Sequence, residues 1–241
     1  MWLENGRLAA TSRDRNIRDA LQWGALDKKV IVCAEDRDIS KLHGILSQDH
    51  DLERDVAIIP FSGVSKMGSG HALAAFRQSL GNKHKFIVYR DRDCQTNEEL
   101  ERWFKEYSDL GYGSLISSGV EIENEYIDPA NISYVIDVDY DTASEIVSDA
   151  IKHNEDELRA KFRSKRQSIN ITLHKDGGSP STDDLWENLP EYRKFGGKML
   201  LSKIYQEIER RRLSRFDLLQ TVEEVTIGAP LISAVRNQVY T

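Results

Sequence analysis

The sequence has few cysteines, and their positions fit neither a zinc module nor a disulfide framework. Cys33 and Cys94 lie far apart in the chain of 241 residues and form no Cys-x-x-Cys pair. The six histidines show no zinc-ligand spacing with these cysteines, which argues against a structural zinc site. A reduced, cytoplasmic environment is therefore expected.

Several other features are missing. No apolar run approaches the length of a membrane span, and residues 1–18 contain no apolar signal core. There is no Walker A sequence, so the chain carries no P-loop ATPase of its own. No Gly-x-Ser-x-Gly elbow surrounds Ser62, Ser65 or Ser69, so these serines indicate no hydrolase of that type. The net charge of −7 does not indicate a nucleic-acid-binding protein, but an acidic site that holds phosphates through metal ions would be compatible with it.

The hydrophobic pattern predicts strands that alternate with helices. Apolar, β-rich runs predict strands at residues 30–34, 55–63, 85–93 and 114–120. Amphipathic patterns predict helices at residues 12–23, 39–46, 70–80 and 97–110. Four β-α repeats with these spacings suit right-handed crossovers and predict an α/β fold with a doubly wound, Rossmann-like parallel sheet.

The pattern becomes mainly helical from about residue 142. It includes a β-like patch at 169–173, a surface loop rich in Gly, Ser, Pro and Asp at 174–184, and a helix at 200–212. We therefore expect three parts: an N-terminal helical segment (1–27), an α/β domain (28–140) and a mainly helical C-terminal extension (141–241).

Carboxylates follow three of the predicted strands. Glu35 follows the first strand, with Asp36 and Asp38 just beyond it. The third strand ends in Asp91 and Asp93, which alternation along an extended chain would place on one side. The fourth strand leads into two further acids, Glu121 and Glu123.

In open α/β sheets, ligands bind at the carboxyl ends of the strands. Carboxylates gathered there repel one another unless a cation neutralises them, and hard oxygen ligands suit Mg²⁺ or Mn²⁺. Each acid taken singly is equally compatible with a turn, a helix cap or a solvated surface. Their coincidence at the strand ends is what predicts a metal site.

Two basic stretches and one glycine-rich turn are candidates for binding phosphate. The stretches run from Arg159 to Arg166 and from Arg210 to Arg215, and either is also compatible with a solvated helix face. The turn at residues 67–70 (MGSG) is compatible with a phosphate cradle or with a plain turn. The candidate nucleic-acid contacts are Arg163, Lys165, Arg166, Arg211 and Arg212.

The segments VIVCAEDRD, FIVYRDRD and GVEIENEYI together resemble the Toprim domain, in which one strand runs into a Glu and another ends in Asp-x-Asp. The resemblance covers residues 28–127, about half of the chain. The acidic segment after the fourth strand is most similar to nucleases of the overcoming-lysogenisation-defect (OLD) type and to related phage-defence nucleases. The resemblance implies a Mg²⁺- or Mn²⁺-dependent endonuclease with an ABC/OLD-type ATPase partner. The opening residues 1–13 would then be the end of a preceding domain.

By this resemblance Glu35, Asp91, Asp93 and Glu123 are metal ligands or their base, and Glu121 competes with Glu123. Lys198, in FGGKMLLSKI, is similar to a family lysine that contacts phosphate or the developing charge.

The sequence departs from the family at two positions. Asp36 stands where many members have Gly, and Ile39 stands where an acid is usual, so Asp38 is the candidate replacement. These departures leave the number of metal ions open. A topoisomerase is less compatible with this chain, which is too short for a separate tyrosine-bearing domain. A bacterial primase or recombination mediator is also less compatible, because it would usually bring a zinc module and none is visible.

Three alternatives remain open. The same site suits a nuclease that processes structured RNA. A phosphoacceptor receiver domain would place acids similarly, but the separation of 56 residues between Glu35 and Asp91 is long for that fold. The third alternative is a non-catalytic module that senses a partner.

Overall fold

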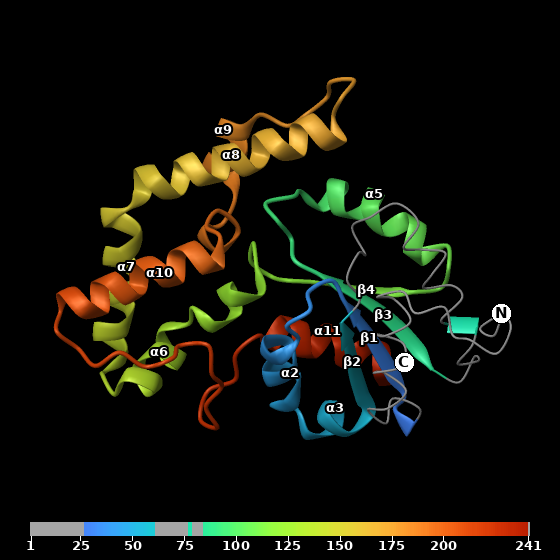
Figure 1. The fold of residues 1–241 in the computed structure, drawn as a ribbon, viewed down its shortest axis with the longest axis horizontal. Helices are drawn as coiled ribbons and strands as arrows, with labels where there is room; N and C mark the ends of the chain where they lie inside the picture. Colours follow the sequence, from blue (N-terminus) through green and yellow to red (C-terminus); the bar gives the residue numbers. More distant parts are fainter. Residues whose placement is uncertain (1–26, 61–76, 79–83, 241) are drawn as a thin grey trace, which may run out of the picture. The chain divides into compact units, whose positions relative to one another are not determined.

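The computed structural model describes residues 27–60, 77–78 and 84–240 (Figure 1). The helix predicted at 12–23 and most of the turn and helix predicted at 67–80 lie outside the described residues. The chain forms two compact units. The sheet unit comprises residues up to Arg90, Phe104–Leu115 and the chain from Ile232 onward, and the helical unit comprises Asp91–Trp103 and Ile116–Leu231.

The sheet unit contains a four-stranded parallel sheet, which confirms the predicted α/β, Rossmann-like class. Its strands are β1 (Val30–Ala34), β2 (Val56–Pro60), β3 (Lys85–Arg90) and β4 (Gly113–Ile116), in the order β2-β1-β3-β4. Every residue of β1 is buried, as expected for an apolar central strand that is covered on both faces.

The strand order reverses at β1. This strand pairs in parallel with β2 on one side and with β3 on the other, with Val30 opposite both Val56 and Lys85. Such a reversal leaves a crevice outside the carboxyl ends of the two central strands, and open α/β sheets bind their ligands there. The residues that follow β1 and β3 are Glu35 and Asp91.

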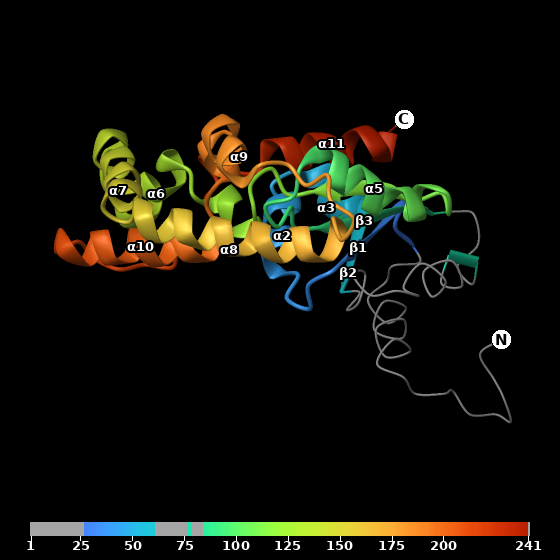
Figure 2. The same cartoon turned by 90° about the horizontal axis from the view of Figure 1, so that it is seen from above.

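Among the described residues, the sheet unit also contains α2 (Ser40–Ser47), α3 (His50–Asp55), the part of α5 (Asn97–Ser108) that begins at Phe104 and the part of α11 (Ala229–Tyr240) that begins at Ile232. Figure 2 shows α11 running across the strands on one face of the sheet. Its Gln238 side chain donates to the carbonyl of Ser114, and its Tyr240 hydroxyl donates to Asp55 at 2.9 Å. Asp55 also pairs with Lys29, so this buried carboxylate joins the residue before β1 to the end of α11.

The helical unit confirms a mainly helical C-terminal part. Its core gathers apolar side chains such as Ile132, Ile146, Phe162, Ile204 and Ile208. Within the described ranges, no helix is both long and apolar enough to cross a membrane. The helices of this unit are α6 (Pro129–Ile136), α7 (Tyr140–His153), α8 (Glu155–Leu173), α9 (Thr182–Asn188) and α10 (Gly197–Arg210), with 3-10 turns η2 (Ile122–Tyr126) and η3 (Glu191–Arg193).

The β-like patch predicted at 169–173 is wrong, because these residues form the last turns of α8. Arg166 donates to the Asn170 side chain one turn later, and the His174 N–H bonds to the Asn170 carbonyl. These local contacts continue the helix to its end, and the weak β preference of Ile169 and Ile171 does not decide the structure there. The helices predicted at 97–110 and 200–212 are observed as α5 (Asn97–Ser108) and α10.

The compact units do not follow the predicted division at residue 140. The helical unit begins at Asp91, and α5 starts in the helical unit and ends in the sheet unit. The last helix, α11, returns to the sheet unit.

Candidate metal and phosphate site

Glu35 lies at the carboxyl end of β1 in the sheet unit. Its N–H donates to the Tyr89 carbonyl at 3.1 Å, so the ladder between β1 and β3 continues one residue beyond the strand. Its carboxylate is 25% exposed and lies 3.8 Å from the buried guanidinium of Arg90, the last residue of β3. A charge-compensated carboxylate therefore stands at the edge where the fold predicts a ligand.

The predicted Asp-x-Asp segment is held by the backbone of the chain that follows β4. The Asp91 side chain accepts a hydrogen bond from the Ile122 N–H, and the Asp93 N–H donates to the Val120 carbonyl, both at 2.9 Å. The Arg92 N–H donates to the buried Ser117 hydroxyl at 2.9 Å. These bonds keep two acidic segments of the helical unit, 91–93 and 121–123, side by side.

The strand predicted to reach Asp93 ends at Arg90, so strand alternation does not orient the two aspartates. Asp93 and Cys94 instead adopt left-handed conformations, with φ of 53° and 62°. Such a conformation costs a non-glycine residue about 1–2 kcal/mol. A turn with two such residues beside the acidic segments is a local strain of the kind that clusters at functional sites.

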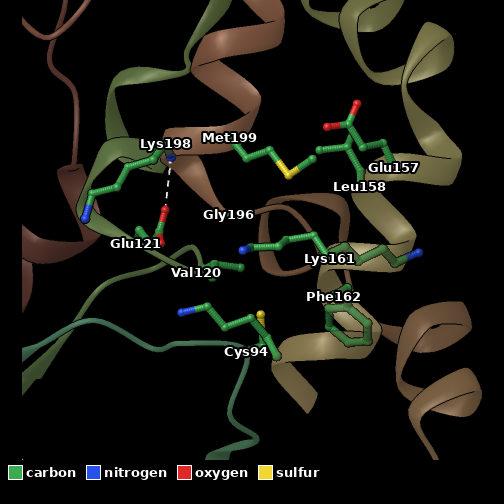
Figure 3. Close-up of a pocket in the computed structure, with 12 residues that line it drawn as sticks. Cys94, Val120, Glu121, Glu157, Leu158, Lys161, Phe162, Gly196, Lys198 and Met199 are labelled. Carbon is green, nitrogen blue, oxygen red and sulfur yellow. Dashed lines mark hydrogen bonds between the residues drawn. The ribbon is translucent and has the colours of Figure 1, made fainter. Parts of the chain in front are cut away.

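Glu121 and Glu123 lie at the start of η2. Glu121 and Asn124 form a capping box, in which each side chain binds the backbone of the other. The Glu121 carboxylate also accepts the Lys198 N–H at 3.0 Å and so caps the first turn of α10 (Figure 3). Glu123 is buried, and its carboxylate lies 3.9 Å from the Lys198 ammonium. Sequence reasoning paired Lys198 with these acids, and the structure brings the three together.

Gly197 is required by the close approach of α10 to η2. A Cβ on Gly197 would lie 2.6 Å from the Asn124 nitrogen and 2.8 Å from the Glu123 Cβ. The Asn124 nitrogen belongs to the backbone and the Glu123 Cβ is attached to it, so neither atom can move aside without a shift of the backbone. The Gly-Gly-Lys sequence thus has a packing reason, which explains how Lys198 comes to stand beside Glu123.

Replacing Gly197 by alanine should push α10 away from η2. We expect a loss of about 1–3 kcal/mol in the free energy of unfolding, as for other overpacked sites. Denaturant titration would measure it. Gly196→Ser is the matched control, because a Cβ there lies no closer than 3.4 Å to Glu121 and serine is a favoured N-cap. Equal stability of both variants would contradict this account.

Asp38, the candidate replacement for the missing family acid, forms a local turn just before α2, whose N-cap is Ile39. Its carboxylate accepts bonds from the Ser40 N–H and hydroxyl, and it pairs with Lys41 at 3.1 Å. The Ser40 hydrogen bonds and Lys41 lower the pKa of this largely exposed carboxyl to about 2. Asp38 therefore has a structural role that accounts for its presence.

A cavity of about 560 Å³ lies beside the acidic segments in the helical unit (Figure 3). One wall comes from α8, another from the start of α10, and a third from the segments that carry Cys94 and Val120. The lining residues include the lysines Lys161, Lys165, Lys194 and Lys198, the acids Glu121 and Glu157, and the apolar Val120, Leu158, Phe162 and Met199.

Sequence reasoning selected Lys165 and Lys198 but missed Lys161 and Lys194. Lys161 lies one helical turn before Lys165 on α8, a spacing that places both on one face. That signal was available in the basic stretch. Lys194 follows η3, and its approach to the cavity depends on how that turn packs, with its ammonium 5.5 Å from the Trp186 ring.

The predicted basic contacts divide into three groups. Lys165 points to Asp93 at 3.4 Å and belongs to the candidate site. Arg163 is exposed but bound to Asp183 at 2.7 Å, and Arg211 pairs with Asp149 at 2.6 Å and with Glu207. Arg212 is exposed beyond the end of α10.

Arg166 requires a correction. Its side chain is fully buried, and its guanidinium makes a bidentate pair with Glu99 at 2.7 and 2.9 Å. A side chain in this position is not available to a nucleic acid. Arg166 is therefore withdrawn from the candidate nucleic-acid contacts and assigned to the core of the helical unit.

The cysteines offer no nucleophile. Burial raises the pKa of both Cys33 and Cys94 to about 12, and Asp93 adds to the effect at Cys94. Thiolate forms are therefore negligible near neutral pH.

Across residues 27–60, 77–78 and 84–240, no group of three or more His, Cys, Asp or Glu side chains is arranged to hold a metal ion. The carboxylates in question are instead compensated by Arg90, Lys165 and Lys198. No family profile, curated protein or solved structure matches the chain.

Proposed function

We propose that this chain is a metal-dependent nuclease that hydrolyses nucleic-acid phosphodiesters, with DNA as the favoured substrate. The observation that carries the proposal is the pairing of the two acidic segments next to a lysine-lined cavity. The Asp91–Ile122 and Asp93–Val120 hydrogen bonds hold these segments together. Carboxylates for a cation and lysines for a phosphate then occur in one compact unit.

The donor chemistry fits a hard divalent cation. Asp91, Asp93 and Glu121 or Glu123 offer carboxylate oxygens in the helical unit, and the resemblance to Toprim domains implies Glu35 as a further ligand. Neighbouring carboxylates need positive charge, and arginine and lysine side chains supply it in the structure shown. When bound, Mg²⁺ or Mn²⁺ would lower the pKa of an attacking water and offset the charge of the leaving oxygen.

The protein side chains have separate tasks in this proposal. The Asp91 carboxylate accepts the Ile122 N–H and so holds the start of η2 in place. Asp91 therefore positions the acids of η2 and is itself a candidate metal ligand beside them. The Lys198 ammonium lies 3.9 Å from the Glu123 carboxylate, and the Lys165 ammonium lies 3.4 Å from the Asp93 carboxylate. If a cation neutralised these carboxylates, both ammonium groups would be able to bind a phosphate oxygen.

The resemblance to Toprim nucleases supports the same assignment and extends it. By that resemblance the chain would act in the cytoplasm as the effector of a phage-defence system, beside or joined to an ABC/OLD-type ATPase. The ATPase partner follows from the resemblance alone.

A cleavage assay tests the proposal. Plasmid DNA, single-stranded oligonucleotides and structured RNA should each be incubated with the chain in Mg²⁺, in Mn²⁺ and in EDTA. We expect metal-dependent cuts in DNA that Glu35→Ala abolishes. Cleavage of RNA alone would reassign the substrate, and cleavage that persists in EDTA would overturn the metal proposal.

The non-catalytic module is the second candidate, because the described carboxylates form no group arranged to hold a metal. The same assay separates the two functions when it is repeated with an ATPase partner added. Binding of the partner without cleavage of any substrate would favour the module.

A further inference from the structure

The cavity in the helical unit is much larger than a phosphate group. Its volume of about 560 Å³ falls within the range of about 300–1,000 Å³ that is typical of small-molecule sites. We propose that it binds one nucleotide unit, with the phosphate at the lysines and the base against the apolar wall. This inference deepens the proposed function. It rests on that function in one respect, namely that the nucleotide belongs to a nucleic-acid strand.

The charges of the lining favour an anion. Four lysines line the cavity with two carboxylates, Glu121 and Glu157. Glu157 is already bound to Lys203 at 2.6 Å, and Lys203 is not among the lining residues. Glu121 is engaged at the start of α10 through the Lys198 N–H. Asp93 and Glu123 pair with the lining residues Lys165 and Lys198, so five lysines and four carboxylates surround the cavity when these partners and Lys203 are included. This small positive excess, in a protein of net charge −7, favours an anion.

The apolar wall distinguishes a nucleotide from a simple phosphate. Half-buried Met199 and the aliphatic stems of the lysines form an apolar surface of the cavity, with the nearly fully buried side chains of Val120, Leu158 and Phe162 behind it (Figure 3). The Phe162 ring is held edge-on by Trp186, with the ring centroids 5.4 Å apart. A free phosphate would gain nothing from contact with such an apolar surface, whereas a nucleobase would bury an apolar face against it.

Two sources share this chemistry: a free nucleoside monophosphate and an unstacked nucleotide of a strand. The neighbouring acidic segments favour the strand, because Lys165 and Lys198 contact both the cavity and the candidate metal ligands Asp93 and Glu123. A nucleotide held in the cavity would bring its own phosphate to those ligands.

Binding should be measured in EDTA, so that cleavage plays no part. The probes are each nucleoside 5′-monophosphate and a fluorescent single-stranded oligonucleotide. We expect Lys161→Gln/Lys194→Gln to weaken binding by about tenfold or more, since each lysine loses a charged contact. Lys105→Gln, an exposed lysine of α5 outside the cavity, is the matched control and should bind as the wild type does.

A second variant blocks the cavity without changing its charge. Gly196 lines the cavity, and a Cβ there would meet nothing closer than 3.4 Å, so a larger side chain can enter beside Glu121. Gly196→Leu should weaken binding by about tenfold, as expected for loss of a buried base contact.

The outcomes separate this inference from the nuclease proposal. Tight binding of monophosphates identifies a free nucleotide as the ligand, and binding of the oligonucleotide alone identifies a strand. Failure of both probes to bind overturns the inference, as does equal binding by the wild type, Gly196→Leu and the double lysine variant. Binding without cleavage in metal would count against the nuclease and leave the nucleotide site standing.

Discussion

Arg166→Met should lower the free energy of unfolding by about 3–5 kcal/mol, as expected when one partner of a buried ion pair is removed. Glu99 is only 2% exposed, and its carboxylate is bound by Arg166 and by His174 at 2.7 Å. Methionine keeps the bulk of the arginine stem but leaves that charge without its main partner. Urea denaturation followed by circular dichroism would measure the change.

Arg163→Met is the matched control, because it makes the same change one turn earlier on α8. Arg163 is 53% exposed, and its partner Asp183 is 62% exposed, so the loss should stay below about 1 kcal/mol. The double variant Glu99→Met/Arg166→Met should recover much of the lost stability, since apolar replacements for a buried pair are often neutral. If Arg166→Met and Arg163→Met were equally stable, the buried pair would contribute no more to the free energy of unfolding than the exposed pair does.

Acid titration identifies the charge that is responsible. Burial alone raises the pKa of Glu99, but hydrogen bonds from Arg166, the Thr96 N–H and His174 outweigh burial and lower it to about 2. A depressed folded-state pKa adds stability that is fully present above the unfolded value, near pH 4.5, and disappears as the pH falls towards 2. The contribution is about 3 kcal/mol at about 1.4 kcal/mol per unit. Glu99→Gln should flatten the stability curve across this window.

The sheet was predictable because its signals are local. An apolar run such as Val30–Ala34 has no stable place except a strand covered on both faces, and the alternation of such runs with helices fixes a parallel arrangement. The return of α11 to the sheet was not predictable. It depends on contacts between residues far apart in the sequence, such as Gln238 with Ser114 and Tyr240 with Asp55.

The candidate site was predictable in its acids and less so in its bases. Glu35, Asp91 and Glu121 were selected because they follow strands, a relation visible in the sequence. The basic stretch of α8 is visible too, but its residues have different environments: Lys165 lines the cavity, Arg163 is exposed and Arg166 is buried. The rotation of α8 against Glu99 decides which of them faces the cavity, and periodicity alone does not specify that rotation.

Asp91→Asn should reduce metal-dependent cleavage by about 10²–10⁴-fold, which corresponds to the several kcal/mol that a metal ion supplies to the transition state. The substitution separates two roles of this residue. Asparagine keeps a side-chain oxygen that can accept the Ile122 N–H, so the start of η2 stays in place. It removes the negative charge that a divalent cation requires. The melting temperature should therefore change little, while the Mn²⁺ affinity measured by electron paramagnetic resonance falls with the cleavage rate.

Two further variants separate the effect of the Asp91 charge from the effect of its hydrogen bond. Asp128→Asn makes the same change at the cap of α6, where the side chain accepts the Ala130 N–H at 2.7 Å, and it should cleave as the wild type does. Asp91→Ala removes both the charge and the acceptor, so it should lose stability as well as cleavage. Full cleavage by Asp91→Asn with unchanged Mn²⁺ affinity would leave Asp91 a purely structural residue. Loss of cleavage at unchanged stability would instead show that its charge, and not its hydrogen bond to η2, is what the reaction needs.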